Sequence, residues 1–290
     1  MYRKALLLVT VAAIFSAPAR ALEVGADISV GNFNFDPDRS PADTDFDPYY
    51  LPVEYSVYGR HKIDDTSCVS FGIGADRILG NLMYGLFSYS GDYYTLSVGP
   101  FFGLFNTEET PVNPGVTASV RFQIPGKAFM VLETSRSLAL ANFFSGGGLS
   151  PDVEDTGDYI QEDNRIALGV YVRNTILSFA IRSRLLSEAD ADYGVITDSL
   201  TDYSVTTDIY RKNSPFKALI SFTYRSLSKH FEDAIPASRH TAGSLILGTR
   251  IDFSVRRHTA AYVSLDRGFY TFGLDDLIGE FGSPDFFFTA

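Results

Sequence analysis

The sequence contains no tryptophan, three methionines and one cysteine. The single cysteine, Cys68, cannot form an internal disulfide, so no disulfide framework holds the chain together. Basic residues are also scarce, because 24 Lys and Arg stand against 35 Asp and Glu, for a formal net charge of −11. A phosphate backbone attracts a basic surface, so this balance excludes nucleic acid as the expected partner.

Long hydrophobic runs are missing after the first 21 residues. The chain opens "MYRKALLLVTVAAIFSAPARAL", in which Arg3 and Lys4 precede an apolar run over residues 5–17. Ala19-Arg20-Ala21 then matches an A-x-A cleavage site, and the pattern predicts a cleaved secretory signal over residues 1–21. A membrane anchor or a buried helix is the alternative, but the run is shorter than the ~20 residues of a spanning helix. The remaining residues, 22–290, are expected to form one domain.

Alternation of apolar with polar or small residues fills this domain. In "LEVGADISV" (22–30), Leu22, Val24 and Ile28 alternate with Glu23 and Asp27. The same period of two recurs in segments 51–60, 67–76, 115–124, 165–173 and 244–255. A period of two is typical of strands with two unlike faces, and no convincing helical period interrupts it. The sequence therefore predicts an all-β protein.

The connections between these strands alternate in length. Short connections are expected at 61–65, 90–92, 124–127, 173–175, 210–215 and 256–258, and longer polar ones at 34–49, 106–113, 141–163, 187–201, 228–240 and 273–284. Residues 78–80 are the exception, a short connection where a long one is due. This rhythm gives fourteen strands, or twelve if 202–210 and 281–289 are dropped. The fourteen expected strands are 22–33, 51–60, 66–77, 81–90, 92–105, 115–124, 127–138, 164–173, 175–186, 202–210, 216–226, 242–255, 259–272 and 281–289.

Charge is sorted between the two kinds of connection. Basic residues lie in or beside the short ones: Lys62, Lys127, Arg173, Arg211, Lys212, Arg256 and Arg257. Acidic residues fill the long ones, with Asp36, Asp38, Asp43, Asp45 and Asp47 in the first and Asp152, Glu154, Asp155, Asp158, Glu188, Asp190, Asp192 and Asp198 later. Sorting of this kind indicates that the two ends of the strands face different compartments.

The whole mature chain, in its strand length, its alternating connections and its sorted charges, resembles bacterial outer-membrane β-barrel proteins of the porin-like class. The resemblance implies a closed antiparallel up-and-down transmembrane barrel in the outer membrane, with lipid and the outer-membrane assembly machinery as partners. The chain ends "GSPDFFFTA", with two small residues after the last phenylalanine, which departs from the terminal aromatic common in such barrels. A soluble secreted β-barrel or sandwich that binds a small ligand is the alternative fold.

In such a barrel the apolar face of each strand points to lipid and the polar face lines the lumen. The polar face of the first three strands carries an acidic group of residues: Glu23, Asp27, Glu54 and Asp76. The polar face of the middle and later strands carries a basic group: Arg121, Arg165, Arg173, Arg182, Arg184, Lys217, Arg225 and Arg250. In a ring of about fourteen strands these groups are expected on opposite walls, where lining charges set which solutes pass.

The sequence thus predicts a porin-like channel for passive diffusion of small polar solutes. A non-conducting structural or adhesive barrel with acidic surface loops is the alternative, because opposite charges can fill a small lumen. No G-x-S-x-G or H-E-x-x-H motif is present, and no histidine precedes a serine by two residues, so we expect no enzyme and no cofactor. The acidic run "DTDFD" (43–47) lacks the full calcium-loop pattern, and no metal site is predicted. The permeant solute and the oligomeric state stay open.

Overall fold

The computed structural model describes residues 22–31, 53–76, 79–104, 112–137, 159–190, 194–210, 214–231, 238–256, 259–272 and 286–289. All regular structure in these residues is β-strand, and they contain no helix long and apolar enough to cross a bilayer. The strands are β1 (Leu22–Gly31), β2 (Val53–Lys62), β3 (Ser67–Asp76), β4 (Gly80–Ser90), β5 (Tyr94–Leu104), β6 (Val112–Ile124), β7 (Ala128–Ser137), β8 (Tyr159–Val172), β9 (Thr175–Asp190), β10 (Gly194–Tyr210), β11 (Phe216–Phe231), β12 (Ser238–Arg256), β13 (Thr259–Phe272) and β14 (Phe286–Thr289).

Each strand pairs antiparallel with its neighbours in sequence, from β1 to β14. This confirms the prediction of an all-β, antiparallel, up-and-down sheet. The first thirteen strands have ten residues or more, whereas β14 has four and is shorter than the expected strand 281–289. β14 pairs with β13 and, over three residues, with β1. The predicted signal segment, 1–21, and the acidic run 43–47 lie outside the described residues.

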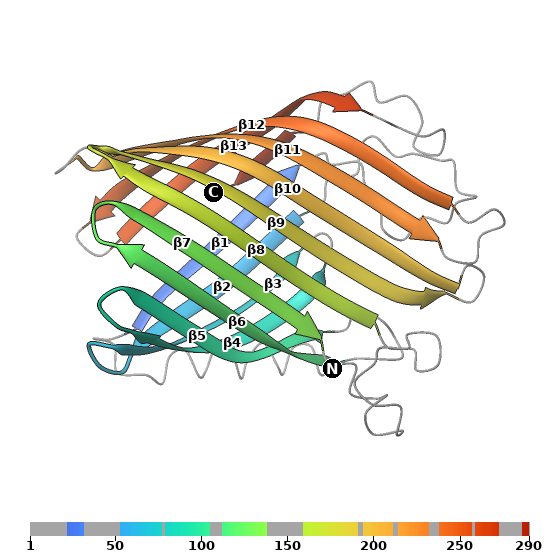
Figure 1. Ribbon diagram of the computed structural model, residues 1–290, viewed down its shortest axis with the longest axis horizontal. Helices are drawn as coiled ribbons and strands as arrows, with labels where there is room; N and C mark the ends of the chain where they lie inside the picture. The colour runs from blue at the N-terminus through green and yellow to red at the C-terminus, as the bar shows by residue number, and fades with distance from the viewer. Residues whose placement is uncertain are drawn as a thin grey trace.

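The sheet curves around an interior, so that β1–β3 run behind β7–β9 in Figure 1. Short hairpin turns at 63–66, 91–93, 125–127 and 173–174 join strands at one end of the sheet. Gly126 in one of these turns has a φ of +68°, which glycine adopts without a steric cost. We call this the turn end, and the opposite end the loop end.

The outer face of the sheet is apolar. Along β8, Val172, Val170, Leu168 and Ile166 all point outward, and each is about half exposed. Exposed apolar side chains recur on this face of the other strands: Val24, Ile28, Val69, Leu96, Val98, Val116, Phe122, Leu177, Phe179, Val205, Ile220, Phe222, Leu247, Ile251, Val263 and Leu265. A protein surrounded by water rarely exposes such a contiguous apolar surface, which suits contact with lipid hydrocarbon.

The arrangement of apolar residues outward and polar residues inward changes toward the loop end of β10. Asp202, Ser204, Thr206 and Asp208 point inward, but beyond Asp202 the inward side chains include Leu200 and Ile196, which are 1% and 7% exposed. The outward residues of this segment are Thr201, Ser199 and Thr197. The strand thus continues past the apolar outer band, with its hydroxyl-bearing face outward.

The prediction of long loops at 187–201 and 228–240 is therefore wrong for residues 187–190, 194–201, 228–231 and 238–240. β9 continues to Asp190 and β10 begins at Gly194, while β11 continues to Phe231 and β12 begins at Ser238. The polar residues on the outward face of these segments led to the prediction of loops. The segments instead extend the strands beyond the apolar band. Asp198, predicted in a solvated acidic loop, is 2% exposed within β10.

Candidate functional site

Strand register places the predicted lumen residues, apart from Arg173, on the inward face of the sheet. Residues directly opposite each other on paired strands share a face. One such row runs across β7–β11, pairing Glu133 with Arg165, Arg165 with Arg182, Arg182 with Asp202 and Asp202 with Arg225. These residues alternate with the exposed apolar residues of the outer face, so they project into the interior.

The basic group is interleaved with acidic residues that the sequence analysis left out. Arg182 binds Asp163 through two hydrogen bonds of 3.0 and 2.7 Å, and Arg165 binds Glu133 at 3.1 Å. Arg250 binds Asp252 at 2.7 Å. The interior face of β7–β12 is therefore mixed in charge and not simply basic. The acids were visible in the same alternating phase of their strands and could have been found by reading both charges in every strand.

One nearly buried ion pair crosses the interior. Arg184 on β9 donates to Asp76 on β3 at 2.7 Å, although these strands are not neighbours in the sheet. The same guanidinium lies 3.5 Å from Asp202, which in turn accepts two hydrogen bonds from Arg225 at 2.8 and 3.0 Å. The four side chains are between 8% and 16% exposed. One predicted acidic residue and two predicted basic residues thus meet in a single cluster, which we call the crossing cluster: Asp76, Arg184, Asp202 and Arg225.

A second contact crosses the interior beside this cluster. The side-chain amide of Gln161 on β8 donates to the backbone carbonyl of Leu79, next to the start of β4. Gln161 is fully buried and Leu79 is 2% exposed. Phe101 on β5 is 3% exposed and belongs to the same cavity lining as Leu79. The two crossings therefore narrow the interior toward the loop end.

Other predicted residues lie on the interior face away from the crossing cluster. Asp27 accepts hydrogen bonds from Ser56 and from the Tyr262 hydroxyl. The Arg250 guanidinium lies 3.7 Å from the centre of the Tyr262 ring, and Arg121 lies 4.8 Å from that of Phe129. Such cation–π contacts fix guanidinium groups without removing their charge.

Three predicted residues lie nearer the turn end. Glu23 is opposite Arg60 in the β1–β2 register, and both are exposed. Lys217 is exposed and lies opposite Tyr210 and Asp252. Arg173 is not on a strand but in the β8–β9 turn, with a φ of 54°, so its placement in the basic group of the lumen is corrected.

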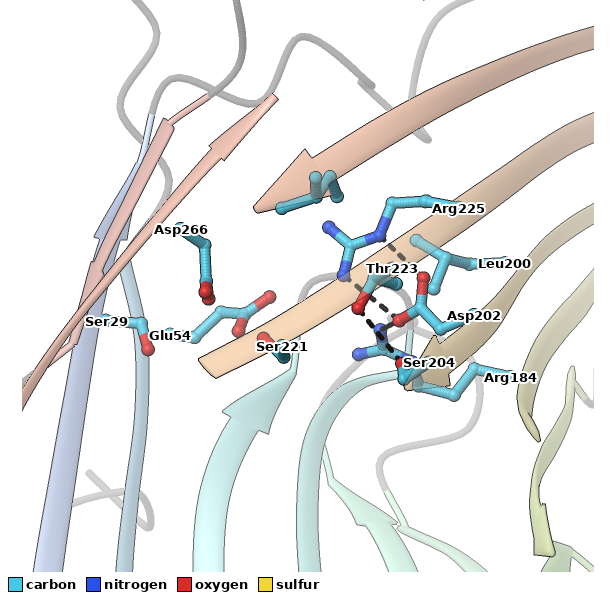
Figure 2. Close-up of a pocket in the computed structure, with 11 residues that line it drawn as sticks. Ser29, Glu54, Arg184, Leu200, Asp202, Ser204, Ser221, Thr223, Arg225 and Asp266 are labelled. Atoms are coloured by element: carbon cyan, nitrogen blue, oxygen red, sulfur yellow. Dashed lines mark hydrogen bonds and ion pairs between the residues drawn. The ribbon is translucent and has the colours of Figure 1, made fainter. Parts of the chain in front are cut away.

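Three cavities lie on the interior face around the crossing cluster. The first, of about 170 Å³, is lined by Glu54, Asp266, Arg184 and Arg225 among others. Figure 2 shows Glu54 and Asp266 together on one side of it, with the two arginines on the other and Ser221 between. The other two cavities, of about 220 and 390 Å³, are both lined by Asp76, Tyr84 and Arg182. The interior is thus divided into separate spaces by side chains of the crossing cluster.

Two other features bear on the site. Cys68 is buried on the interior face, and its sulfur accepts a hydrogen bond from Arg60 Nε at 3.3 Å. Among the described residues, no group of three or more His, Cys, Asp and Glu is arranged to hold a metal ion.

Comparisons with known proteins find similarity in structure but not in sequence. No family model and no curated protein matches the sequence. Similar solved structures include a loop-deletion mutant of OmpT, an outer membrane protein of Vibrio cholerae, with 8% identity over 93% of this chain and 98% of that one at a TM-score of 0.47. A porin matches with 8% identity over 92% and 99% at 0.43, and a bacterial polysaccharide outer membrane secretin with 12% over 94% and 99% at 0.43. These neighbours are bacterial outer-membrane β-barrels, and at such TM-scores they say nothing about the activity of this chain.

Proposed function

We propose that this chain is exported to the bacterial outer membrane, where residues 22–290 form a closed fourteen-stranded barrel. The pairing of β14 with both β13 and β1 supports closure, because a spanning sheet in lipid needs a partner for every edge. The apolar outer face supports the location in lipid. Lipid and the outer-membrane assembly machinery are the partners that this location requires.

We propose further that the lumen is a pathway for small polar solutes, narrowed at the crossing cluster. One observation carries this proposal: the interior face bears paired charged side chains around cavities, whereas the outer face is apolar. Charged side chains that line a pore determine which ions pass. In this proposal interleaved Arg and Asp residues line the lumen, in place of the acidic wall facing a basic wall that the sequence predicted.

The crossing contacts favour a second candidate, a non-conducting barrel. Side chains that are nearly fully buried, such as Leu79, Leu200 and Gln161, do not line an open water path. In this function the interior contacts hold the barrel rigid, and the loop end serves as a surface structure.

Planar-bilayer recording of the purified mature chain separates the two candidates. The channel proposal predicts discrete conductance steps, and their size is expected to grow when Asp76 is changed to Asn. The absence of steps both in the parent chain and in Asp76→Asn would support the non-conducting barrel instead. Folding is checked in parallel by heat-modifiable migration on a gel, so that a misfolded variant is recognised as such.

A further inference from the structure

The largest of the three interior cavities, of about 390 Å³, has two unlike sides. We call it the large cavity. Its volume falls within the range of about 300–1,000 Å³ that is typical of pockets for small molecules. Residues of β4 and β5 border it on one side, and residues of β6–β9 border it on the other. The chemistry of these two sides indicates which solute fits between them.

The β4–β5 side is apolar and aromatic. Leu82, Tyr84 and Leu86 are alternate residues of β4, so their side chains share the inward face. Phe101 lies opposite Tyr84 in the strand register and lines the same cavity. A Cβ atom at Gly72 on β3 would overlap the Tyr84 ring, so one face of this ring rests against the backbone of β3. The other face is left for a solute in the cavity.

The β6–β9 side carries ion pairs. Arg182 holds Asp163 through two hydrogen bonds, and all of these atoms belong to residues that line the cavity. Arg165 holds Glu133 at 3.1 Å in the same lining. The four side chains are between 23% and 44% exposed, so part of their hydrogen-bonding capacity is open to a solute. Within each pair the two charges cancel.

Paired charges favour a neutral solute over an ion. An ion that is attracted by one member of a pair is repelled by the other member at a similar distance. A hydroxyl group both donates and accepts hydrogen bonds, so one hydroxyl can donate to Glu133 while it accepts from Arg165. Hydrogen bonds to ionised groups are stronger than those between neutral groups. The polar side therefore suits a solute that is uncharged and rich in hydroxyls.

From these two sides we propose that the large cavity binds an uncharged sugar ring. Such a ring presents C–H groups on its faces and hydroxyl groups at its edge. The C–H face lies on the Tyr84 ring, because the negative face of an aromatic ring attracts weakly positive hydrogens. The hydroxyl edge meets the Arg182–Asp163 and Arg165–Glu133 pairs. The inference rests on the proposed function, because the solute reaches the cavity through the lumen.

Saturation-transfer NMR with the folded mature chain tests this binding without requiring conduction. The chain is held in micelles of a detergent that has no sugar headgroup. The probes are glucose, the open-chain polyol sorbitol, cationic glucosamine and anionic glucuronate. We expect the strongest transfer to the C–H protons of glucose. No transfer to glucose, or equal transfer to sorbitol or to either charged sugar, would overturn the proposal.

A change on the aromatic side locates the bound ring. Tyr84→Leu keeps an apolar side chain but removes the aromatic face, and is expected to weaken glucose binding about tenfold, equivalent to about 1.4 kcal/mol. Tyr89→Leu is the matched control, since Tyr89 lies on the same strand but on its outward face and is 43% exposed. Heat-modifiable migration identifies a variant that does not fold. Equal loss of binding in the two folded variants would contradict the assignment.

A change on the polar side tests the role of the ion pairs and does not depend on the Tyr84 variant. Glu133→Gln leaves Arg165 without this carboxylate, so we expect transfer to glucuronate to rise and transfer to glucosamine to fall. Asp252→Asn is the control, since it removes a carboxylate of the interior face that does not line the large cavity. Unchanged transfer to both charged sugars in Glu133→Gln would contradict this placement of the ring.

Bilayer recording distinguishes failure of this inference from failure of the channel proposal. Glucose binding without conductance would leave the site intact and refute the channel. Conductance without glucose binding would leave the channel intact and refute the site.

Discussion

Asp76 and Arg184 are 108 residues apart in the sequence and form an ion pair of 2.7 Å across the interior. Both side chains are nearly buried, and Arg184 also lies 3.5 Å from Asp202. An ion pair within one strand pair would only stabilise that hairpin. This one joins β3 to β9 and so fixes the width of the interior.

Breaking this pair is expected to widen the path and weaken the fold. Asp76→Asn removes the negative charge opposite the buried Arg184 guanidinium, which then keeps only its longer ion pair with Asp202, and loss of one charged partner from a buried pair costs about 3–5 kcal/mol. We expect a larger single-channel conductance and a lower unfolding temperature, measured by bilayer recording and by heat-modifiable migration. Asp252→Asn is the control, because its partner Arg250 is 39% exposed on the side chain and does not cross the interior. Equal effects of the two changes on conductance would rule out a special role for the crossing.

A positive charge on the outer face should be costly within the apolar band and tolerated beyond it. Leu168 and Asn164 lie on β8, point to the same side and are both exposed. If the band meets lipid, Leu168→Arg destabilises the barrel by about 2–4 kcal/mol, whereas Asn164→Arg near the interface costs about 0–1 kcal/mol. Reversible unfolding by denaturant in lipid vesicles measures both. Similar costs at the two positions would place the band elsewhere.

The close approach of β4 and β5 should exclude a side chain at Gly99 but allow one at Gly85. A Cβ at Gly99 would overlap the backbone carbonyl of Gly85, which cannot move without separating the strands. A Cβ at Gly85 would meet only Pro100 Cγ at 3.9 Å, an ordinary contact. We expect Gly99→Ala to lower the unfolding temperature and Gly85→Ala to leave it nearly unchanged. A fall of the same size in both variants would show that the strands are not so closely apposed.

The β2–β3 turn should depend on pH. Asp64 Oδ1 accepts hydrogen bonds from the backbone amides of Thr66 and Ser67, each at 2.7 Å, and the bonds from Thr66 hold the pKa of Asp64 below its ordinary value. A lowered pKa in the folded state means that this stabilisation is complete above the unfolded pKa of about 3.9 and is lost as pH falls below it. Amide hydrogen exchange at Thr66 and Ser67 should therefore show falling protection in this acid range. Asp64→Asn keeps an acceptor oxygen but does not titrate, so its protection should not change in the same range.

Much of the fold could be predicted from the sequence because one signal, alternation with a period of two, continues through every strand. The predicted strand 259–272 has the same two bounds as β13. Turn residues flank this segment, and its two faces differ clearly in polarity. Strands β9–β12 were predicted too short at the loop end, because the polar residues of their outward face look like loop residues. Apolar and polar residues still alternate in the part of β10 that was missed, but there the apolar residues Leu200 and Ile196 point inward.

The candidate site was only partly predictable. Alternation assigns a side chain to a face, so the common face of Asp76, Arg184 and Arg225 follows from the sequence. Which residues meet across the interior depends on the curvature of the sheet and on strand register, which no local pattern contains. The Asp76–Arg184 and Leu79–Gln161 crossings therefore required coordinates.

The orientation of the two faces is tested most directly by spin labels on adjacent residues of β9. Leu177 points outward and is 46% exposed, and Ser178 points inward. Single cysteines at these positions, in a Cys68→Ser background, carry nitroxides in barrels reconstituted into lipid vesicles. The account predicts that oxygen, which concentrates in lipid, relaxes the label at 177 more, and that a water-soluble nickel chelate relaxes the label at 178 more. The reverse pattern would contradict it.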